Sequence, residues 1–352
     1  MKKKSKFLNR ILTLSTALAL AGTVSGSLSA VAVNAAEEVQ QPQTTATATK
    51  DDEQKMVPAT PATDESSNNQ DDKQPVVPEK EEPAAPVNKK VKTFKVSIVK
   101  KDYGIYQGNF EKKQSSTKYF HKTFNVNKSF TRNGKKYYWI NKKGKPAIGY
   151  INKNAVATTS QAKVLNVPYV SQYVPVKTPW GCAGASMSML LGFQGQKITA
   201  DFLKQVQNHL PMQPTKGGQK GNVYTGEGFG YVISPGALAK YARTYETGKN
   251  VVNVSSKKLT VDDLRMYVQG GKPVLYYGFS SYQKPGDNVR NHCKVITGYK
   301  NGKFLVFDPL YYSKNDGAGT GGKNMNYDHG AIAWLSKATV QQEFCHKAIT
   351  FK

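Results

Sequence analysis

Cysteine, acidic residues and long apolar runs are all scarce in this chain of 352 residues. Three cysteines in so long a chain exclude a scaffold built on disulfides. The one long apolar run lies near the N-terminus, which excludes a membrane protein with several spans. With 38% hydrophobic and 11% aromatic residues, the chain can form folded cores and is not wholly disordered. Its length predicts two folded units with non-globular tails.

Charge is distributed unevenly along the chain. Residues 37–88 hold 12 of the 24 acidic residues and only 4 lysines, which gives a net charge of −8. Residues 89–160 carry 18 basic side chains against two acidic ones, a net charge of +16, and residues 161–352 carry a net charge of +13. The pattern divides the chain into an acidic segment followed by two basic regions.

The N-terminal segment has the order of a secretory signal. Lysines and Arg10 come first, an apolar stretch runs from Ile11 to about Val24, and small residues lead to Ala35. This order predicts a cleavable signal peptide over residues 1–35, and therefore a secreted, extracellular protein. The alternative is an uncleaved anchor helix, but the apolar run is shorter than the roughly 18 to 20 residues that a span needs. We expect no transmembrane anchor after cleavage.

Residues 36–88 consist mainly of Pro, Thr, Ala, Gln and acidic residues. Such a segment buries too little apolar surface to offset the conformational entropy that is lost on ordering. The composition therefore predicts a disordered acidic linker.

Residues 89–160 contain short runs of alternating apolar residues separated by turn signals such as Asn133-Gly134 and Lys143-Gly144. This pattern predicts a small all-β barrel that needs no helix. Residues 137–151, with Gly149-Tyr150, resemble the closing hairpin of the SH3-like GW modules of Gram-positive surface proteins, which have Gly-Trp at that position. The resemblance implies a wall-binding module.

The charge of this module supports the same function independently. A net charge of +16 on so small a domain attracts polyanions, and teichoic and lipoteichoic acids are the abundant ones outside a Gram-positive cell. We therefore expect a cell-wall-associated protein, and export argues against nucleic acid as the natural partner. The alternative is a basic surface that is merely solvated. The predicted polyanion-binding residues are Lys135, Lys136, Lys142, Lys143 and Lys145.

Residues 161–352 contain a candidate nucleophile. A short strand over residues 164–170 is followed by Gln172, and Cys182 then begins a predicted helix that stops at Gly192. The positive end of a helix dipole favours a thiolate and lowers the thiol pKa. The alternative is a buried and inert thiol, which is the usual state of cysteine.

A thiol nucleophile needs a base, and His292 opens a predicted hairpin that turns at Asn301-Gly302 and closes at Asp308. A two-residue loop with regular pairing would put His292 and Asp308 on opposite faces. A three-residue loop over residues 300–302, or an equivalent bulge, puts them on one face about 7 Å apart. We predict the latter. The alternation turns Cys293 to the other face, so it is not expected to be the nucleophile.

This constellation resembles the papain-like cysteine peptidases of the bacteriocin-processing type, family C thirty-nine. The resemblance implies an α+β papain-like fold over residues 161–352 and a peptide substrate. It implies that Cys182 is the nucleophile, His292 the general base and acid, and Asp308 its orienter. Gln172 would bind the oxyanion together with the Cys182 backbone N–H.

The chain departs from the family pattern at two places. It has Cys182-Ala183-Gly184 where the family commonly has Cys-Gly-Pro, and Cys293-Lys294 where a small residue commonly follows the histidine. The leading interpretation is an exported, cell-wall-associated peptidase that acts through an acyl-enzyme. An inactive papain-like adhesion module and a thiol acyltransferase are the alternatives.

Other features are weaker. Asp328-His329 is a second candidate base pair, without a hairpin to support it. A disulfide between Cys293 and Cys345 stays open, because the sequence fixes no distance. No cluster has metal-ligand spacing and the glycine-rich stretches do not join a strand to a helix, so we expect no metal and no other cofactor. Further helices are predicted after Ser234 and after Thr260, and a core strand over residues 272–277.

Overall fold

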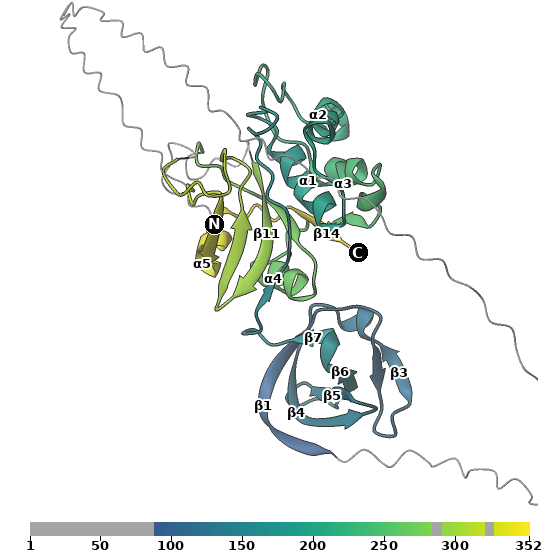
Figure 1. The fold of residues 1–352 in the computed structure, drawn as a ribbon. Helices are drawn as coiled ribbons and strands as arrows, with labels where there is room; N and C mark the ends of the chain where they lie inside the picture. The colour runs from purple at the N-terminus through teal and green to yellow at the C-terminus, as the bar shows by residue number, and fades with distance from the viewer. Residues whose placement is uncertain (1–87, 284–290, 321–326) are drawn as a thin grey trace, which may run out of the picture. The chain divides into compact units, whose positions relative to one another are not determined.

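The computed structural model describes residues 88–283, 291–320 and 327–352 (Figure 1). The predicted signal peptide and nearly all of the predicted linker lie outside these residues. The described strands form two separate sheets, one over residues 89–157 and one over residues 163–351. No helix in the described part of the chain combines the length and the apolar character needed to cross a bilayer.

The first sheet contains seven strands in the order β3-β2-β6-β5-β4-β1-β7, and all of its neighbours are antiparallel. The strands are β1 Lys89–Ile98, β2 Gly104–Tyr106, β3 Lys112–Ser115, β4 Thr123–Arg132, β5 Lys135–Asn141, β6 Gly149–Asn152 and β7 Val156–Ala157. Two short 3-10 helices, Ser116–Tyr119 and Lys153–Ala155, also occur in this region, which was predicted to need no helix. The likeness to an SH3-like GW module stays a prediction.

Strand β4 is long, yet the sequence pattern did not reveal it. Phe124 and Val126 alternate as expected of a strand, but the pairing with β5 shifts between Val126 and Lys128. After this bulge, Ser129 and Phe130 are both buried. A bulge interrupts the two-residue period, and the period was the signal used to find strands.

Gly149 and Tyr150 have distinct structural roles in this sheet. Gly149 has a φ of 137°, and a Cβ atom there would lie 2.3 Å from the backbone oxygen of Tyr106. No other residue fits at this approach of two strands. Tyr150 is buried and its ring packs against those of Phe130 and Trp139, with centroids 4.6 and 4.5 Å apart.

The second sheet has the order β13-β12-β11-β10-β14-β9, and β8 also pairs with β11. Its strands are β8 Lys163–Val164, β9 Val251–Asn253, β10 Val274–Gly278, β11 His292–Lys300, β12 Lys303–Phe307, β13 Ile332–Ser336 and β14 Ala348–Phe351. The α-helices are α1 Cys182–Phe193, α2 Ala200–Asn208, α3 Pro235–Ala242, α4 Val261–Gln269 and α5 Lys337–Glu343. This region is therefore mixed α and β. In Figure 1, α1 and α5 lie on either side of β11.

Helix α1 is a core helix. All of its residues from Cys182 to Leu191 are buried, which is the pattern of a helix surrounded by protein. The Ser186 hydroxyl donates to the backbone oxygen of Cys293 at 2.9 Å and fixes the helix against β11. The helix starts at Cys182 as predicted and ends at Phe193, one residue beyond the predicted stop at Gly192.

Two further helices begin where the sequence predicts. Ser234 caps α3 through the N–H of Ala237, with Pro235 at the first helical position. Thr260 caps α4 and forms a reciprocal capping box with Asp263. The predicted core strand over residues 272–277 is present as β10.

The β11–β12 hairpin has the predicted bulge but not the predicted three-residue loop. Lys300 pairs with Lys303, so the loop is the two-residue turn Asn301-Gly302, with φ values of 52° and 77°, and not the three-residue loop. The equivalent bulge is present instead, because the pairing shifts between Ile296 and Gly298. Thr297 is the extra residue, and it restores the register that places His292 and Asp308 on one face.

Candidate active site

Cys182 is the first residue of α1 and is 5% exposed. The residue before it, Gly181, caps the helix without any side-chain hydrogen bond. The first backbone N–H groups of a helix have no partner within it, and they carry the positive end of its dipole. The thiol therefore lies where a negative charge is stabilised.

Three buried glutamines hold the turn that precedes Cys182. Each donates a side-chain N–H to one of three consecutive backbone oxygens: Gln172 to Pro179 at 2.6 Å, Gln219 to Trp180 at 3.1 Å and Gln207 to Gly181 at 3.0 Å. The turn is therefore fixed by side chains from three separate segments. Sequence reasoning identified Gln172 alone, because isolated glutamines carry no pattern that points to a shared turn.

His292 and Asp308 form a short, buried polar contact. His292 Nε2 lies 2.6 Å from Asp308 Oδ1, and both residues are 4% exposed. The same carboxylate oxygen accepts the backbone N–H of Leu310 at 3.0 Å. Because Nε2 is engaged by Asp308, the other ring nitrogen is left for Cys182, which lines the same cleft as His292.

The electrostatics favour an ion pair between the thiol and the imidazole. A hydrogen bond from the Cys293 thiol and the charge of His292 hold the pKa of Cys182 well below its usual value, although burial opposes this. Burial also works to lower the pKa of His292, but the Asp308 carboxylate and the Cys182 thiolate raise it to about 9. Both pKa shifts favour a thiolate on Cys182 and an imidazolium on His292.

Cys293 is completely buried beside Cys182, and burial raises its pKa well above the usual value. Cys293 therefore favours the protonated thiol beside Cys182. All three cysteines are free thiols, so the structure contains no bridge between Cys293 and Cys345.

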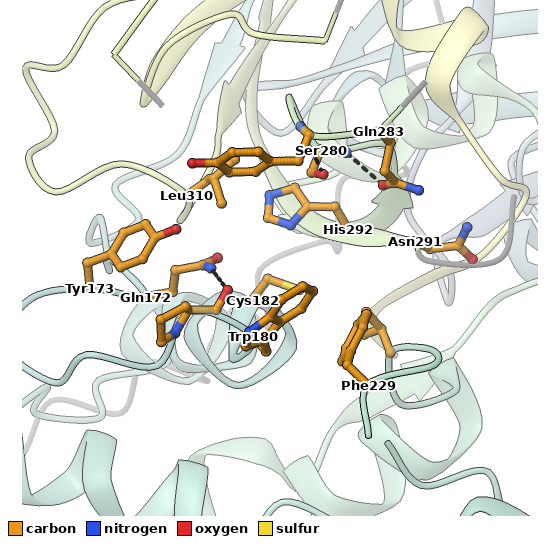
Figure 2. A pocket seen from close by; sticks show the side chains of 13 residues that line it. Gln172, Tyr173, Trp180, Cys182, Phe229, Ser280, Gln283, Asn291, His292 and Leu310 are labelled. Carbon is orange, nitrogen blue, oxygen red and sulfur yellow. Dashed lines mark hydrogen bonds between the residues drawn. The ribbon is translucent and has the colours of Figure 1, made fainter. Parts of the chain in front are cut away.

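A cleft of about 390 Å³ opens over Cys182 and His292 (Figure 2). Gln172 lines the same cleft, so the structure brings together all four residues named from the sequence, with Asp308 behind His292. Aromatic rings contribute to the remaining walls, and no Asp, Glu, Lys or Arg is found among the described lining residues. The aromatic members are Tyr173, Trp180, Phe229 and Tyr282.

The second candidate base pair is not assembled. The Asp328 carboxylate accepts from the Tyr311 hydroxyl, and its other oxygen accepts from the Gly319 N–H at 2.8 Å. His329 Nε2 is buried without a hydrogen-bond partner among the described residues. Both carboxylate oxygens of Asp328 are therefore used in hydrogen bonds to Tyr311 and Gly319.

The five predicted polyanion-binding lysines are all exposed. Lys135 and Lys136 begin β5, and the other three lie in the turn that follows it. Lys142 and Lys143 also line a shallow hollow of about 240 Å³, which contains Lys95 and the side chains of Asn125 and Asn141.

Residues 164–334 match the model of the Peptidase_C39 like family. The match supports a C39-like, papain-like fold for this part of the chain and, at the level of the family, a cysteine peptidase. The matched segment contains Gln172, Cys182, His292 and Asp308. A search among curated proteins finds no match.

Solved structures include similar proteins. A protein assigned as a C39-like peptidase from Bacillus anthracis is 21% identical, with a TM-score of 0.41, over 55% of this chain and 98% of that chain. A double-glycine-motif protease from an AMS/PCAT transporter, in complex with the leader peptide, is 14% identical, with a TM-score of 0.32, over 54% and 95%. A protein assigned as an autolysin from Listeria monocytogenes is 21% identical, with a TM-score of 0.20, over 24% and 38%.

Proposed function

We propose that residues 161–352 are an exported cysteine peptidase and that the basic residues 89–160 hold it at the cell wall. The observation that carries the catalytic part is the position of His292, whose Nε2 lies 2.6 Å from the Asp308 carboxylate and which lines one cleft with Cys182. This is the arrangement that activates a thiol for attack on a carbonyl.

The reaction follows from these positions. The Cys182 thiolate attacks the carbonyl carbon of the scissile amide, and the carbonyl π electrons move to its oxygen. The backbone N–H of Cys182 and the Gln172 side chain, whose Nε2 carries a second hydrogen, donate to this oxyanion. His292 gives its proton to the amide nitrogen, the C–N bond breaks, and a thioester remains on Cys182.

Water then resolves the thioester. Neutral His292 takes a proton from the water as it attacks, and the thiolate leaves with the bonding electrons. Asp308 holds the ring in position and stabilises its charged form throughout. The products are a free amine and a free carboxylic acid, and the ion pair is regenerated.

The cleft indicates the class of substrate. Apart from the catalytic pair, its described walls are aromatic, aliphatic, amide and hydroxyl side chains without formal charge. Such walls suit an uncharged peptide segment lying across the sulfur, with backbone amides that Gln172 and neighbouring polar groups recognise.

A peptide library tests the catalytic proposal. We expect the protein to cleave a subset of peptides, Cys182→Ala to abolish cleavage, and Cys345→Ala to leave it unchanged. Cleavage that persists in Cys182→Ala, or a library that stays intact with the unchanged protein, would refute a peptidase of this kind and favour an inactive adhesion module.

Sedimentation with purified cell walls tests the second part. We expect binding to weaken as salt rises and to need teichoic acid, because exposed lysines act through screened charge. Lys142→Glu with Lys143→Glu should weaken binding more than Lys257→Glu with Lys258→Glu, an exposed pair outside residues 89–160. If the amount of protein that sediments with the walls changes neither with salt nor after removal of teichoic acid, wall binding by charge is refuted.

A further inference from the structure

A row of buried ionisable side chains continues from Asp308 into the core. Lys294 Nζ lies 3.6 Å from Asp308 Oδ2 and 2.7 Å from Glu343 Oε2. The other oxygen of Glu343 accepts a hydrogen bond from the hydroxyl of Tyr276. Lys294 and Glu343 are each 1% exposed and Tyr276 is fully buried. The row begins at the oxygen of Asp308 that His292 does not use.

The fold assembles this row on one face of the sheet. Lys294 is two residues after His292 on β11, so alternation directs both side chains to the same face. Tyr276 pairs with Lys294 across β10 and β11, and Glu343 is the last residue of α5. Asp308 follows β12 directly. Four separate elements therefore contribute to one polar cluster.

Burying these charges is unfavourable unless they are paired. Desolvation alone lowers the pKa of a buried ammonium, yet Glu343 and Asp308 together raise the pKa of Lys294 above its usual value. A hydrophobic side chain would fill the position at a lower desolvation cost. Packing alone therefore does not explain why these charged side chains are buried here.

We propose that Lys294 and Glu343 are positioning residues for the catalytic carboxylate: Glu343 holds the Lys294 ammonium back from Asp308, so that Asp308 keeps its short contact with His292. This inference rests on the proposed function. The three distances support it, since the lysine is closer to Glu343 than to Asp308 by 2.7 against 3.6 Å, and the imidazole is closest to Asp308 at 2.6 Å.

Lys294 also stabilises the Asp308 carboxylate during the catalytic cycle. When His292 delivers its proton to the leaving amine, Asp308 loses the positive charge of its nearest partner. The Lys294 ammonium remains beside it and keeps the buried carboxylate ionised until His292 is protonated again. A cation at 3.6 Å can do this without displacing the imidazole.

The pKa shifts of several ionisable groups around the cluster lead away from the pKa of His292. Burial raises the pKa of five tyrosines around the cluster and of Cys293 and Cys345, and it lowers the pKa of His329. These tyrosines are Tyr169, Tyr173, Tyr276, Tyr311 and Tyr327. A change in Cys182 reactivity near pH 9 therefore reports the proton on His292.

The test is the pH dependence of Cys182 modification by iodoacetate, an anion that the imidazolium attracts. It needs no peptide substrate. In Glu343→Gln, Lys294 is free to approach Asp308, so His292 loses its proton more readily and the alkaline limb should move by about one unit to lower pH. In Lys294→Met with Glu343→Gln, the competing cation is gone and the limb should move to higher pH.

The controls separate positioning from stability. Glu246→Gln, an exposed glutamate on a different segment, should leave the limb unchanged. Removing both members of a buried pair should restore much of the thermal stability that Lys294→Met alone loses. If the limb is unchanged in Glu343→Gln and in the double variant while Cys182 stays reactive, the cluster is only structural and the inference is wrong. A wild-type Cys182 no more reactive than an ordinary thiol would refute the proposed function, and this inference with it.

Discussion

His292 lies 2.6 Å from Asp308 across a two-residue hairpin turn that, with regular pairing, would put them on opposite faces of the sheet. Thr297 resolves this conflict, because it is the extra residue of a bulge in β11. The contact between His292 and Asp308 thus depends on one extra residue, five positions after the histidine.

Deleting Thr297 should therefore abolish activity. The turn at Asn301-Gly302 would keep its pairing, and the strand beyond the deletion would slip by one residue, which turns His292 away from Asp308. We expect loss of peptide cleavage and of fast Cys182 alkylation. Thr297→Ser keeps the residue count and should retain both, and equal activity of the deletion variant would contradict the importance of the bulge.

Asp308→Asn should shift the pH dependence of the reaction. The carboxylate, together with the Cys182 thiolate, raises the pKa of His292 to about 9, so His292 keeps its proton, and kcat/KM its value, until the pH approaches 9. The neutral amide removes this effect, and the alkaline limb of kcat/KM should move toward the ordinary imidazole pKa of about 6.5, with at least a tenfold loss near pH 8. Asp201→Asn, an exposed carboxylate in the first turn of α2, should change neither.

Gln172→Ala should lower kcat by about a hundredfold, because it removes one donor to the oxyanion. Iodoacetamide forms no oxyanion, so modification of Cys182 should stay fast. The two assays together distinguish a lost donor from a collapsed turn before the helix, which would slow both. Gln194→Ala, at the exposed end of α1, is the matched control.

Gly184→Ala should destabilise the start of α1. A Cβ atom there would lie 2.7 Å from the amide of Gln207, which holds the oxygen of Gly181. Overpacking of this kind costs about 1 to 3 kcal/mol in the free energy of unfolding. Gly236→Ala in α3 has its nearest neighbour at 3.7 Å and should be neutral or stabilising. Denaturant unfolding of the two variants compares them, and equal stabilities would contradict the tight packing.

The sequence allowed much of the catalytic region to be predicted. Local signals located the starts of the helices after Ser234 and Thr260 and of the helix at Cys182, because caps and dipole effects act over a few residues. Alternation also showed that a plain two-residue hairpin would separate His292 from Asp308. The alternation could not distinguish a longer loop from a bulge, since both restore the same register.

What could not be predicted depends on contacts between distant segments. Gln207 and Gln219 approach the turn before Cys182 only in the folded chain, and Glu343 meets Lys294 from an element 49 residues away. Strand β4 was missed for a different reason, as its own bulge breaks the alternation of buried residues. Neither kind of feature leaves a periodic signal in the sequence.

The rate at which iodoacetamide modifies Cys182 at pH 6 tests the central claim most directly. An ordinary thiol is less than about 1% thiolate at that pH. Cys182, with its lowered pKa, should react at least about tenfold faster than a cysteine in an unstructured peptide, and His292→Ala should remove the advantage. A Cys182 that stays unreactive until about pH 8.5, with the same profile in His292→Ala, would contradict the ion pair on which the proposed chemistry depends.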